Sequence, residues 1–145
     1  MGETKYEDYL NLDEINLKAF NGLKANIQLL NADSEKKVIM ITSAESSEGR
    51  STTTSYLSLL LAKSGKKTII VDCDLKKPNI HNMFGLTNDK GLVNYLSGDV
   101  LFEKVVKTTE IKNLSILTSG ASTLNYAELF VSSRFNEFII SLKKD

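Results

Sequence analysis

An apolar segment, a helical segment and a second apolar segment follow one another between residues 37 and 72, and this order narrows the fold to a few classes. Residues 37–42 ("KVIMIT") and 68–72 ("TIIVD") are short runs rich in apolar and β-branched side chains, which are typical of buried strands. Between them, residues 51–65 have the apolar spacing of a helix, with Gly65 at the expected C-terminal cap. Such a strand–helix–strand unit predicts a right-handed crossover and a parallel sheet.

The remaining segments extend this pattern. Apolar spacing predicts helices over residues 11–30, with Asn11 and Glu14 as a capping pair, and over residues 127–144. A third strand is predicted over residues 114–120, and short helices over 79–83 and 92–96, the latter closed by Gly98. We therefore expect a flexible arm at residues 1–12 and one partial α/β domain at 13–145, with a parallel sheet flanked by helices. Three strands are few for so many helices, so we expect the sheet to be incomplete at the C-terminal end.

Charge and composition exclude several classes of function. Eighteen basic residues balance eighteen acidic ones, so no net field attracts the chain to nucleic acid or to anionic lipid. No apolar run approaches the roughly 18 residues of a membrane-spanning helix. The single cysteine, Cys73, excludes an internal disulfide and fits a reducing cytoplasm. We therefore expect a cytoplasmic location, no nucleic-acid partner and no direct insertion into a membrane.

A near match to a phosphate-binding loop joins the first predicted strand to the helix. Residues 43–52 read "SAESSEGRST", whereas the strict motif is G-x-x-x-x-G-K-[ST]. Gly49 and Ser51 are in register, but Ala44 replaces the first glycine and Arg50 replaces the lysine. Ala44 and Ser47 would each cost about 1 kcal/mol if their positions required positive φ. The position of the loop, between a strand and a helix, is the one in which backbone N–H groups bind an anion.

The residue types of this loop suit phosphate and magnesium chemistry. Gly49 lets the backbone approach phosphates, Ser51 offers a hydroxyl to Mg²⁺, and Thr52 adds a donor. The planar guanidinium of Arg50 can bind phosphate through two N–H groups, but it is broader than a lysine ammonium. We therefore expect Arg50 to impair phosphoryl transfer more than binding. The alternative interpretation is a serine-rich turn in which Ser51 only caps the helix.

Two acidic residues follow the second predicted strand. Asp72 and Asp74 lie at the C-terminal end of a parallel strand, where open α/β sheets bind ligands. Their spacing places both carboxylates on one side of an extended segment, with Cys73 on the other. Paired oxygens suit Mg²⁺ beside a nucleotide phosphate, and one of them could accept a proton from an attacking hydroxyl. The alternative is a solvated acidic pair beside Lys76 and Lys77, which is less favoured next to the phosphate loop.

With both segments considered, the chain resembles the bacterial tyrosine kinase (BY-kinase) family of capsule and exopolysaccharide biosynthesis, from about residue 13 to its end. "ITSAESSEGRST" is similar to the phosphate loop of that family, which tolerates alanine or serine at the first glycine position. "IIVDCDLKKP" resembles its second acidic motif, and residues 81–99 and 113–135 resemble flanking segments. The family's third acidic motif and C-terminal tyrosine cluster are not found in these 145 residues, so we expect a truncated chain.

The resemblance implies a P-loop domain that transfers the γ-phosphate of ATP to tyrosine hydroxyls. The residues carried over by position as the ATP-binding set are Ser47, Glu48, Gly49, Arg50, Ser51 and Thr52. In this comparison Ser51 and Asp74 would bind Mg²⁺, and Asp72 would be the base for the tyrosine hydroxyl. Arg50 stands at the position of the catalytic lysine.

The resemblance also implies partners. They are a membrane-embedded regulator of polysaccharide chain length, which acts as the activator, and further copies of the chain in a homo-oligomer. Binding to the regulator would place the chain at the inner face of the membrane.

Two other functions stay open. A pseudokinase or scaffold that binds nucleotide weakly is favoured by Arg50 and by the family's ring-forming helix motif, E-x-x-R-x-x-R, which falls on Lys18, Asn21 and Lys24. A partitioning or cell-division ATPase of the related P-loop type is less favoured. Those proteins carry a lysine early in the loop, where this chain has Glu45.

Overall fold

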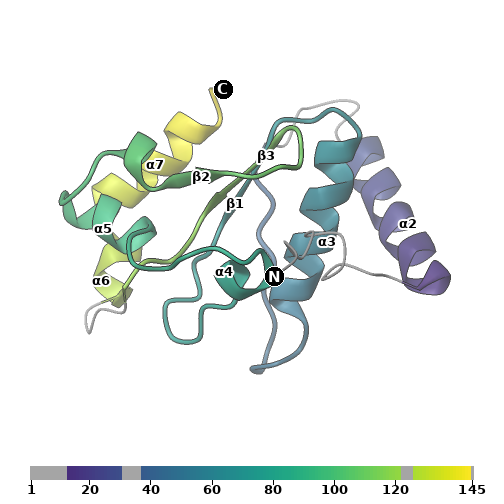
Figure 1. Ribbon diagram of the computed structural model, residues 1–145, viewed down its shortest axis with the longest axis horizontal. Helices are drawn as coiled ribbons and strands as arrows, with labels where there is room; N and C mark the ends of the chain where they lie inside the picture. The colour runs from purple at the N-terminus through teal and green to yellow at the C-terminus, as the bar shows by residue number, and fades with distance from the viewer. Residues whose placement is uncertain (1–12, 31–36, 122–125, 145) are drawn as a thin grey trace, which may run out of the picture.

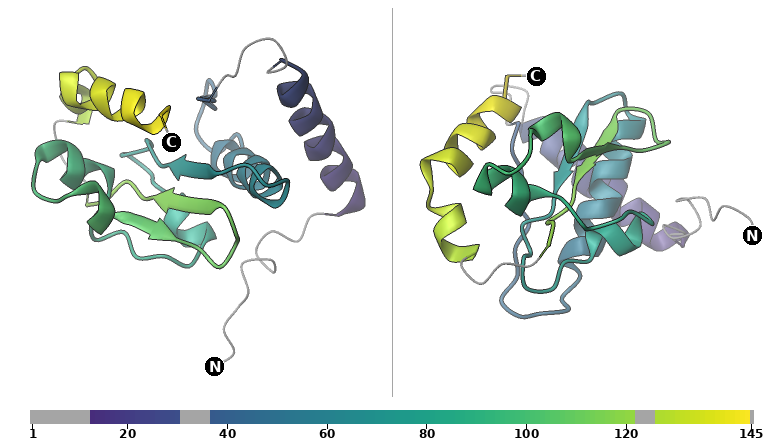
Figure 2. Two further views of the ribbon diagram at one scale, coloured as in Figure 1. Left: turned by 90° about the horizontal axis from the view of Figure 1, so that it is seen from above. Right: turned by 60° about the vertical axis from the view of Figure 1, so that its left-hand side comes forward.

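The computed structural model describes residues 13–30, 37–121 and 126–144, and these residues form a layered α/β structure (Figure 1). A three-stranded sheet lies between two groups of helices in this part of the chain. One group comprises α2 (Glu14–Leu30) and α3 (Arg50–Lys63), and the other comprises α5 (Leu92–Ser97), α6 (Tyr126–Phe130) and α7 (Ser133–Leu142). Helices α2 and α7 lie at opposite ends of this stack, both in Figure 1 and in the left view of Figure 2.

The sheet is mixed, with the strand order β1-β3-β2. Strand β1 (Thr68–Val71) runs parallel to β3 (Leu114–Leu117), and β2 (Val106–Thr108) runs antiparallel to β3. The predicted α/β class with parallel strands flanked by helices is therefore confirmed, but an antiparallel strand is added to it. Strand β2 was not predicted, because Val-Lys-Thr is too short and too polar to stand out as an apolar run.

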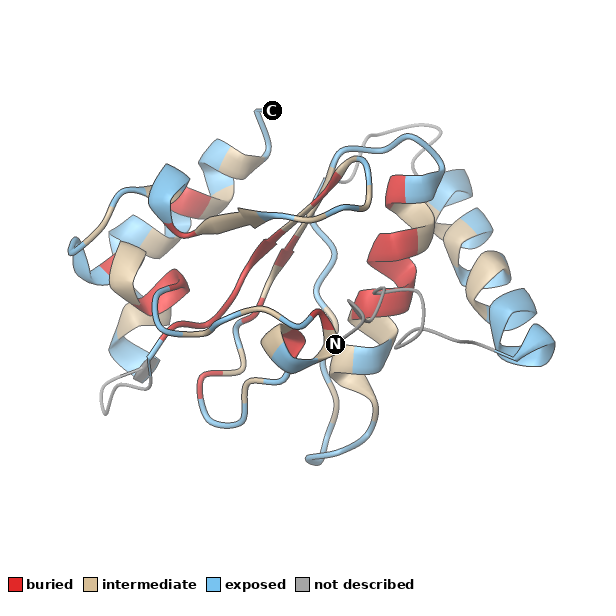
Figure 3. Cartoon of the chain, in the orientation of Figure 1, coloured by how far each residue is buried: buried red, intermediate tan, exposed pale blue. Residues whose placement is uncertain are grey.

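Apolar side chains of the strands alternate between two faces and form two cores. Ile70 and Ile116 pack on one face with Tyr56 of α3. On the other face, Leu117 packs with α5 and with Phe138 of α7. Figure 3 shows buried residues concentrated in the strands and along α3. Because both faces are covered, the sheet holds β1 firmly and fixes the position of the residues that follow it.

The strand predicted over residues 37–42 is not formed, although the structure describes all six residues. They run as coil, and Val38, Ile39 and Met40 are 46%, 43% and 84% exposed. A strand needs a hydrogen-bonding neighbour, and in the described chain β1 pairs only with β3. The prediction of a paired strand–helix–strand unit is therefore wrong, and the parallel pair is β1 with β3.

The two outer helices begin at side-chain caps. Helix α2 follows Asp13, whose Oδ1 accepts a hydrogen bond from the Asn16 N–H at 2.8 Å. The predicted cap Asn11 and the predicted arm at residues 1–12 lie outside the described residues. The single helix predicted over residues 127–144 is wrong, because Ser132 separates α6 from α7. The Ser132 hydroxyl accepts a hydrogen bond from the Phe135 N–H at 3.2 Å and so starts a new helix.

The helices predicted over residues 51–65, 79–83 and 92–96 are formed. Helix α3 is followed by Gly65 at φ 89° and α5 by Gly98 at φ 89°, as expected for glycine after a helix C-terminus. The short segments α4 (Ile80–Met83) and η1 (Phe102–Lys104) lie in the connection from β1 to β2. No helix in the described ranges is both long and apolar enough to span a lipid bilayer.

Replacing Gly22 by alanine is expected to stabilise α2. Gly22 lies in the middle of this helix, and a Cβ atom there would meet no atom within 4 Å. Alanine restricts the unfolded chain and favours the helix by about 1 kcal/mol relative to glycine. Chemical denaturation followed by circular dichroism should show this increase, and a loss of stability would contradict the open space found around Gly22.

Candidate functional site

The loop before α3 has a backbone shape that glycine favours at two positions. Ser47 has φ 66° and Gly49 has φ 84°, both in the left-handed region. A non-glycine residue costs about 1 kcal/mol there, and Ser47 bears this cost whereas Ala44 does not. A Cβ atom built at Gly49 meets nothing within 4 Å. The loop therefore leaves open space at the start of the helix.

Helix α3 begins without a side-chain cap. Its N-cap residue is Gly49, and no side chain accepts a hydrogen bond at this terminus. Ser51 lies within the first turn, so it is not the cap that the alternative interpretation required. The first N–H groups of a helix have no acceptor inside the helix, and the helix dipole places positive potential in front of them. The start of α3 is thus suited to an anion.

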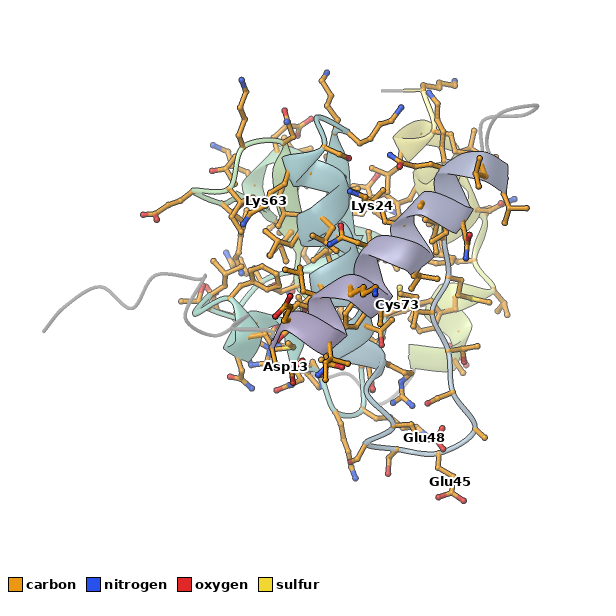
Figure 4. All side chains as sticks on the ribbon, turned by 90° about the vertical axis from the view of Figure 1, so that its right-hand side faces the viewer. Asp13, Lys24, Glu45, Glu48, Lys63 and Cys73 are labelled. Carbon is orange, nitrogen blue, oxygen red and sulfur yellow. The ribbon has the colours of Figure 1, made fainter. Side chains whose placement is uncertain are left out.

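Hydrogen bonds within the loop hold its outer end in place. The Ser43 hydroxyl donates to the Glu45 carbonyl at 2.8 Å, and the Glu48 carboxylate accepts from the Glu45 N–H at 3.1 Å. Figure 4 shows the side chains of Glu45 and Glu48 at the outer end of the loop. Among the predicted ATP-binding residues, Glu48 has its carboxylate engaged within the loop, so only its backbone can contribute to an anion site.

Asp72 and Asp74 follow β1 in two different environments. Asp72 is 5% exposed, and its carboxylate accepts hydrogen bonds from the N–H groups of Asp74 and Ile80 at 3.1 and 3.3 Å. Burial raises the pKa of Asp72 and outweighs these two hydrogen bonds, which act to lower it. Asp74 is more open. Its partial burial acts to raise its pKa, but hydrogen bonds from the Lys77 N–H and the Arg50 guanidinium outweigh this and lower it.

Arg50 joins the loop to the end of β1. Its Nη2 donates to Asp74 Oδ2 at 2.9 Å, and its Nη1 donates to Ser43 Oγ at 2.5 Å and to the Glu45 carbonyl at 2.7 Å. The structure therefore brings the two predicted segments together. Sequence analysis did not single out Ser43, because the motif gives no role to the residue before its first glycine position.

These contacts also decide which ligands the site fits. The uncapped start of α3 and the open space at Gly49 fit a phosphate group. A divalent cation fits less well, because both oxygens of Asp74 already accept hydrogen bonds, one of them from the cationic Arg50. Within the described residues, no group of three or more His, Cys, Asp or Glu side chains could hold a metal ion. The arrangement thus fits an anion at the start of α3 better than it fits a divalent cation at Asp74.

Replacing Asp72 by asparagine is expected to remove a pH-dependent loss of stability, while the amide can accept only one of the two backbone hydrogen bonds that the carboxylate accepts. Because the folded-state pKa of Asp72 lies above its usual 3.8, the fold favours the protonated carboxyl. Its contribution to stability is therefore present at low pH and is lost as pH rises through the folded-state pKa. Asparagine cannot ionise. Denaturation curves should therefore show that the free energy of unfolding of the variant rises relative to that of the wild type as pH rises. A relative loss with rising pH would contradict the burial of Asp72.

A shallow hollow between α5 and α7 lies apart from this site. It is lined by Tyr95, Arg134, Glu137, Phe138 and Ser141. The Arg134 guanidinium carbon lies 5.3 Å from the centre of the Tyr95 ring. None of the predicted site residues lines this hollow, so it is separate from the loop before α3.

Comparison with known proteins gives a family and a set of relatives. A family model described as "ParA: NUBPL iron-transfer P-loop NTPase" matches residues 34–125. The tyrosine-protein kinase YwqD of Bacillus subtilis is 37% identical over 123 residues, which make up 85% of this chain and 52% of that protein. The chain thus spans about half the length of this relative.

Two solved structures resemble the fold of this chain to different extents. The kinase domain of the Escherichia coli tyrosine kinase ETK has a TM-score of 0.87 at 26% identity, and the match covers 97% of this chain and 56% of that one. The septum site-determining protein MinD of Pyrococcus horikoshii, complexed with Mg-ADP, has a TM-score of 0.60 at 31% identity and covers 71% of this chain and 42% of that one. The predicted resemblance to bacterial tyrosine kinases is therefore confirmed.

Proposed function

This chain belongs to the ParA-type family of P-loop NTPases, its relatives include bacterial tyrosine kinases, and from this premise we propose that it is the ATP-binding domain of such a kinase. In this proposal it phosphorylates tyrosine and regulates the synthesis of capsular or exported polysaccharide. One observation carries the proposal. The uncapped start of α3 behind Gly49 lies beside the two aspartates that follow β1.

The ATP phosphates are proposed to bind at the backbone N–H groups of residues 47–52. Gly49 supports this, because its missing side chain leaves open space at the helix start. The hydroxyls of Ser51 and Thr52 would add donors in the first turn of α3. Arg50 would donate hydrogen bonds to the phosphates through the guanidinium N–H groups that make none of its contacts with Ser43, Glu45 and Asp74.

Asp72 is proposed as the base that accepts the proton of a tyrosine hydroxyl. Two backbone N–H groups hold its carboxylate in one orientation. Its pKa is raised by burial, and a raised pKa makes a carboxylate a better proton acceptor near neutral pH. The predicted metal roles of Ser51 and Asp74 stay predictions, and no step of this proposal depends on them.

A second candidate function is a scaffold that binds nucleotide without phosphoryl transfer. The contacts of Arg50 favour it, because a guanidinium held by Ser43, Glu45 and Asp74 must break some of these bonds to follow a moving phosphoryl group. In that case the domain would act through its partners. It would report nucleotide binding rather than modify tyrosine.

The proposed partners are a membrane-embedded regulator of polysaccharide chain length and further copies of this chain. The resemblance to the kinases supports both, and with them a position at the inner face of the membrane.

Two measurements on the purified chain separate these functions. Thermal unfolding with and without ATP reports binding, and transfer of a labelled γ-phosphate to a tyrosine-containing polymer reports kinase activity. The kinase proposal expects both stabilisation and transfer, with transfer lost in Asp72→Asn. Stabilisation without transfer would support the scaffold. No stabilisation by ATP would contradict both.

A further inference from the structure

The side chain of Arg50 is held at three points on two separate segments. Ser43 Oγ and the Glu45 carbonyl hold Nη1 from within the loop, and Asp74 Oδ2 holds Nη2 from the segment after β1. The side chains of Arg50 and Asp74 are 31% and 29% exposed, so the ion pair is partly shielded from solvent. A guanidinium has five N–H donors in a fixed plane, and three of them are used here. The contact is therefore part of a defined network and not a single mobile surface pair.

Asp74 is an unfavourable ligand for a divalent cation because a cationic side chain already lies against it. Its Oδ1 accepts the Lys77 N–H at 3.0 Å, and its Oδ2 accepts Arg50 at 2.9 Å. A cation bound to Oδ2 would lie next to a guanidinium that carries the same sign of charge. The other carboxylate, Asp72, is buried and accepts two backbone N–H groups. A metal ion bound to Asp74 would therefore be repelled by Arg50 as long as the two side chains stay in contact.

We propose that Arg50 takes the place of a divalent cation at Asp74, so that this site binds the phosphates of a nucleotide without Mg²⁺. The inference rests on the proposed phosphate site at the start of α3. Arg50 supplies a positive charge between the loop and Asp74, and two of its five guanidinium N–H donors make none of these three contacts. Nucleotide affinity then depends on the protein's own cation and not on added metal.

A lysine at this position would behave differently. Its ammonium is a compact charge on a slim stem and lacks the planar fork that reaches Ser43, the Glu45 carbonyl and Asp74 together. In Arg50→Lys, Asp74 Oδ2 would lose the guanidinium that lies beside it, and Mg²⁺ would no longer be repelled from this oxygen at contact distance. The substitution should therefore introduce a dependence on Mg²⁺ that the wild type lacks.

The test compares ADP affinity in excess Mg²⁺ and in EDTA, measured by calorimetry on the full 145-residue chain. Wild type should give the same dissociation constant in both conditions, within about twofold, and Arg50→Lys should bind at least about tenfold more tightly with Mg²⁺. Arg134→Lys is the matched control, because it makes the same change on α7, at the Tyr95 ring. It should behave like the wild type.

A tenfold or greater effect of Mg²⁺ on the wild type would overturn the inference while leaving the proposed nucleotide site intact. Absence of ADP binding in both conditions, for wild type and Arg50→Lys alike, would overturn the proposed function as well. Should Arg50→Lys fail to fold, electron paramagnetic resonance of Mn²⁺ with wild type and ADP decides the matter. We expect no protein-bound Mn²⁺ in the presence of ADP, and one bound Mn²⁺ per chain would contradict the inference.

Discussion

Replacing Gly49 by valine should weaken ADP binding by about a hundredfold or more, because the substitution acts on the helix start that meets the phosphates. Gly49 has φ 84°, a conformation that a β-branched residue reaches only at a cost of about 1–2 kcal/mol. No protein atom lies within 4 Å of the added Cβ. The new side chain would therefore enter open space at the start of α3, where we place the phosphates, rather than disturb the core.

Gly65→Val provides the matched control for this prediction. Gly65 has φ 89°, and a Cβ atom added there would also meet no atom within 4 Å, so the same substitution carries a similar backbone cost. It follows the opposite end of α3. Calorimetry should find ADP affinity preserved in Gly65→Val and lost in Gly49→Val. Equal affinities in the two variants would show that phosphates do not bind at Gly49.

Replacing Gly91 by alanine should destabilise the fold by about 3 kcal/mol, at the upper end of the usual cost of overpacking. A Cβ atom at Gly91 would lie 2.1 Å from the Thr118 carbonyl oxygen and 2.4 Å from the Gly120 nitrogen. These are backbone atoms just after β3, and the Leu92 N–H donates to the same Thr118 carbonyl at 2.8 Å. Neither segment can move without breaking the junction between α5 and the sheet.

Gly98→Ala, just after the opposite end of α5, separates crowding from backbone strain. Gly98 has φ 89°, but the nearest atom to a Cβ there is the flexible Arg134 Nη1 at 3.1 Å. Strain alone should cost about 1 kcal/mol, so Gly98→Ala should lose much less stability than Gly91→Ala in urea denaturation. Similar losses in the two variants would contradict the tight contact at Gly91.

Features that depend on local sequence could be predicted for this fold. The helical spacing in α2 and α3 and the apolar runs of β1 and β3 each reflect side chains within one segment. The strand predicted at residues 37–42 fails for a different reason. Its apolar composition fits a strand, but strand formation requires a neighbouring strand, and composition cannot show whether the described chain supplies one.

In the candidate site, too, features set by local sequence could be predicted, whereas contacts that depend on the tertiary structure could not. The loop at Gly49 and the aspartates after β1 could be predicted to lie close together, because the sequence places each after a predicted parallel strand, and the contact is formed although the strand before the loop is not. The contact between Arg50 and Asp74 could not be predicted from the sequence. Arg50 was expected to face phosphate, and its partner depends on where the loop at Ser43 and Glu45 lies in three dimensions.

The central claim is that the backbone at residues 47–52 binds nucleotide phosphates. The most direct test is a titration of the isotope-labelled chain with ADP, followed by amide proton–nitrogen NMR spectra. The account predicts that the largest shifts occur at the amides of residues 47–52, in the loop and the first turn of α3. Shifts confined to another place, such as the hollow at Tyr95 and Arg134, with none at residues 47–52, would contradict it.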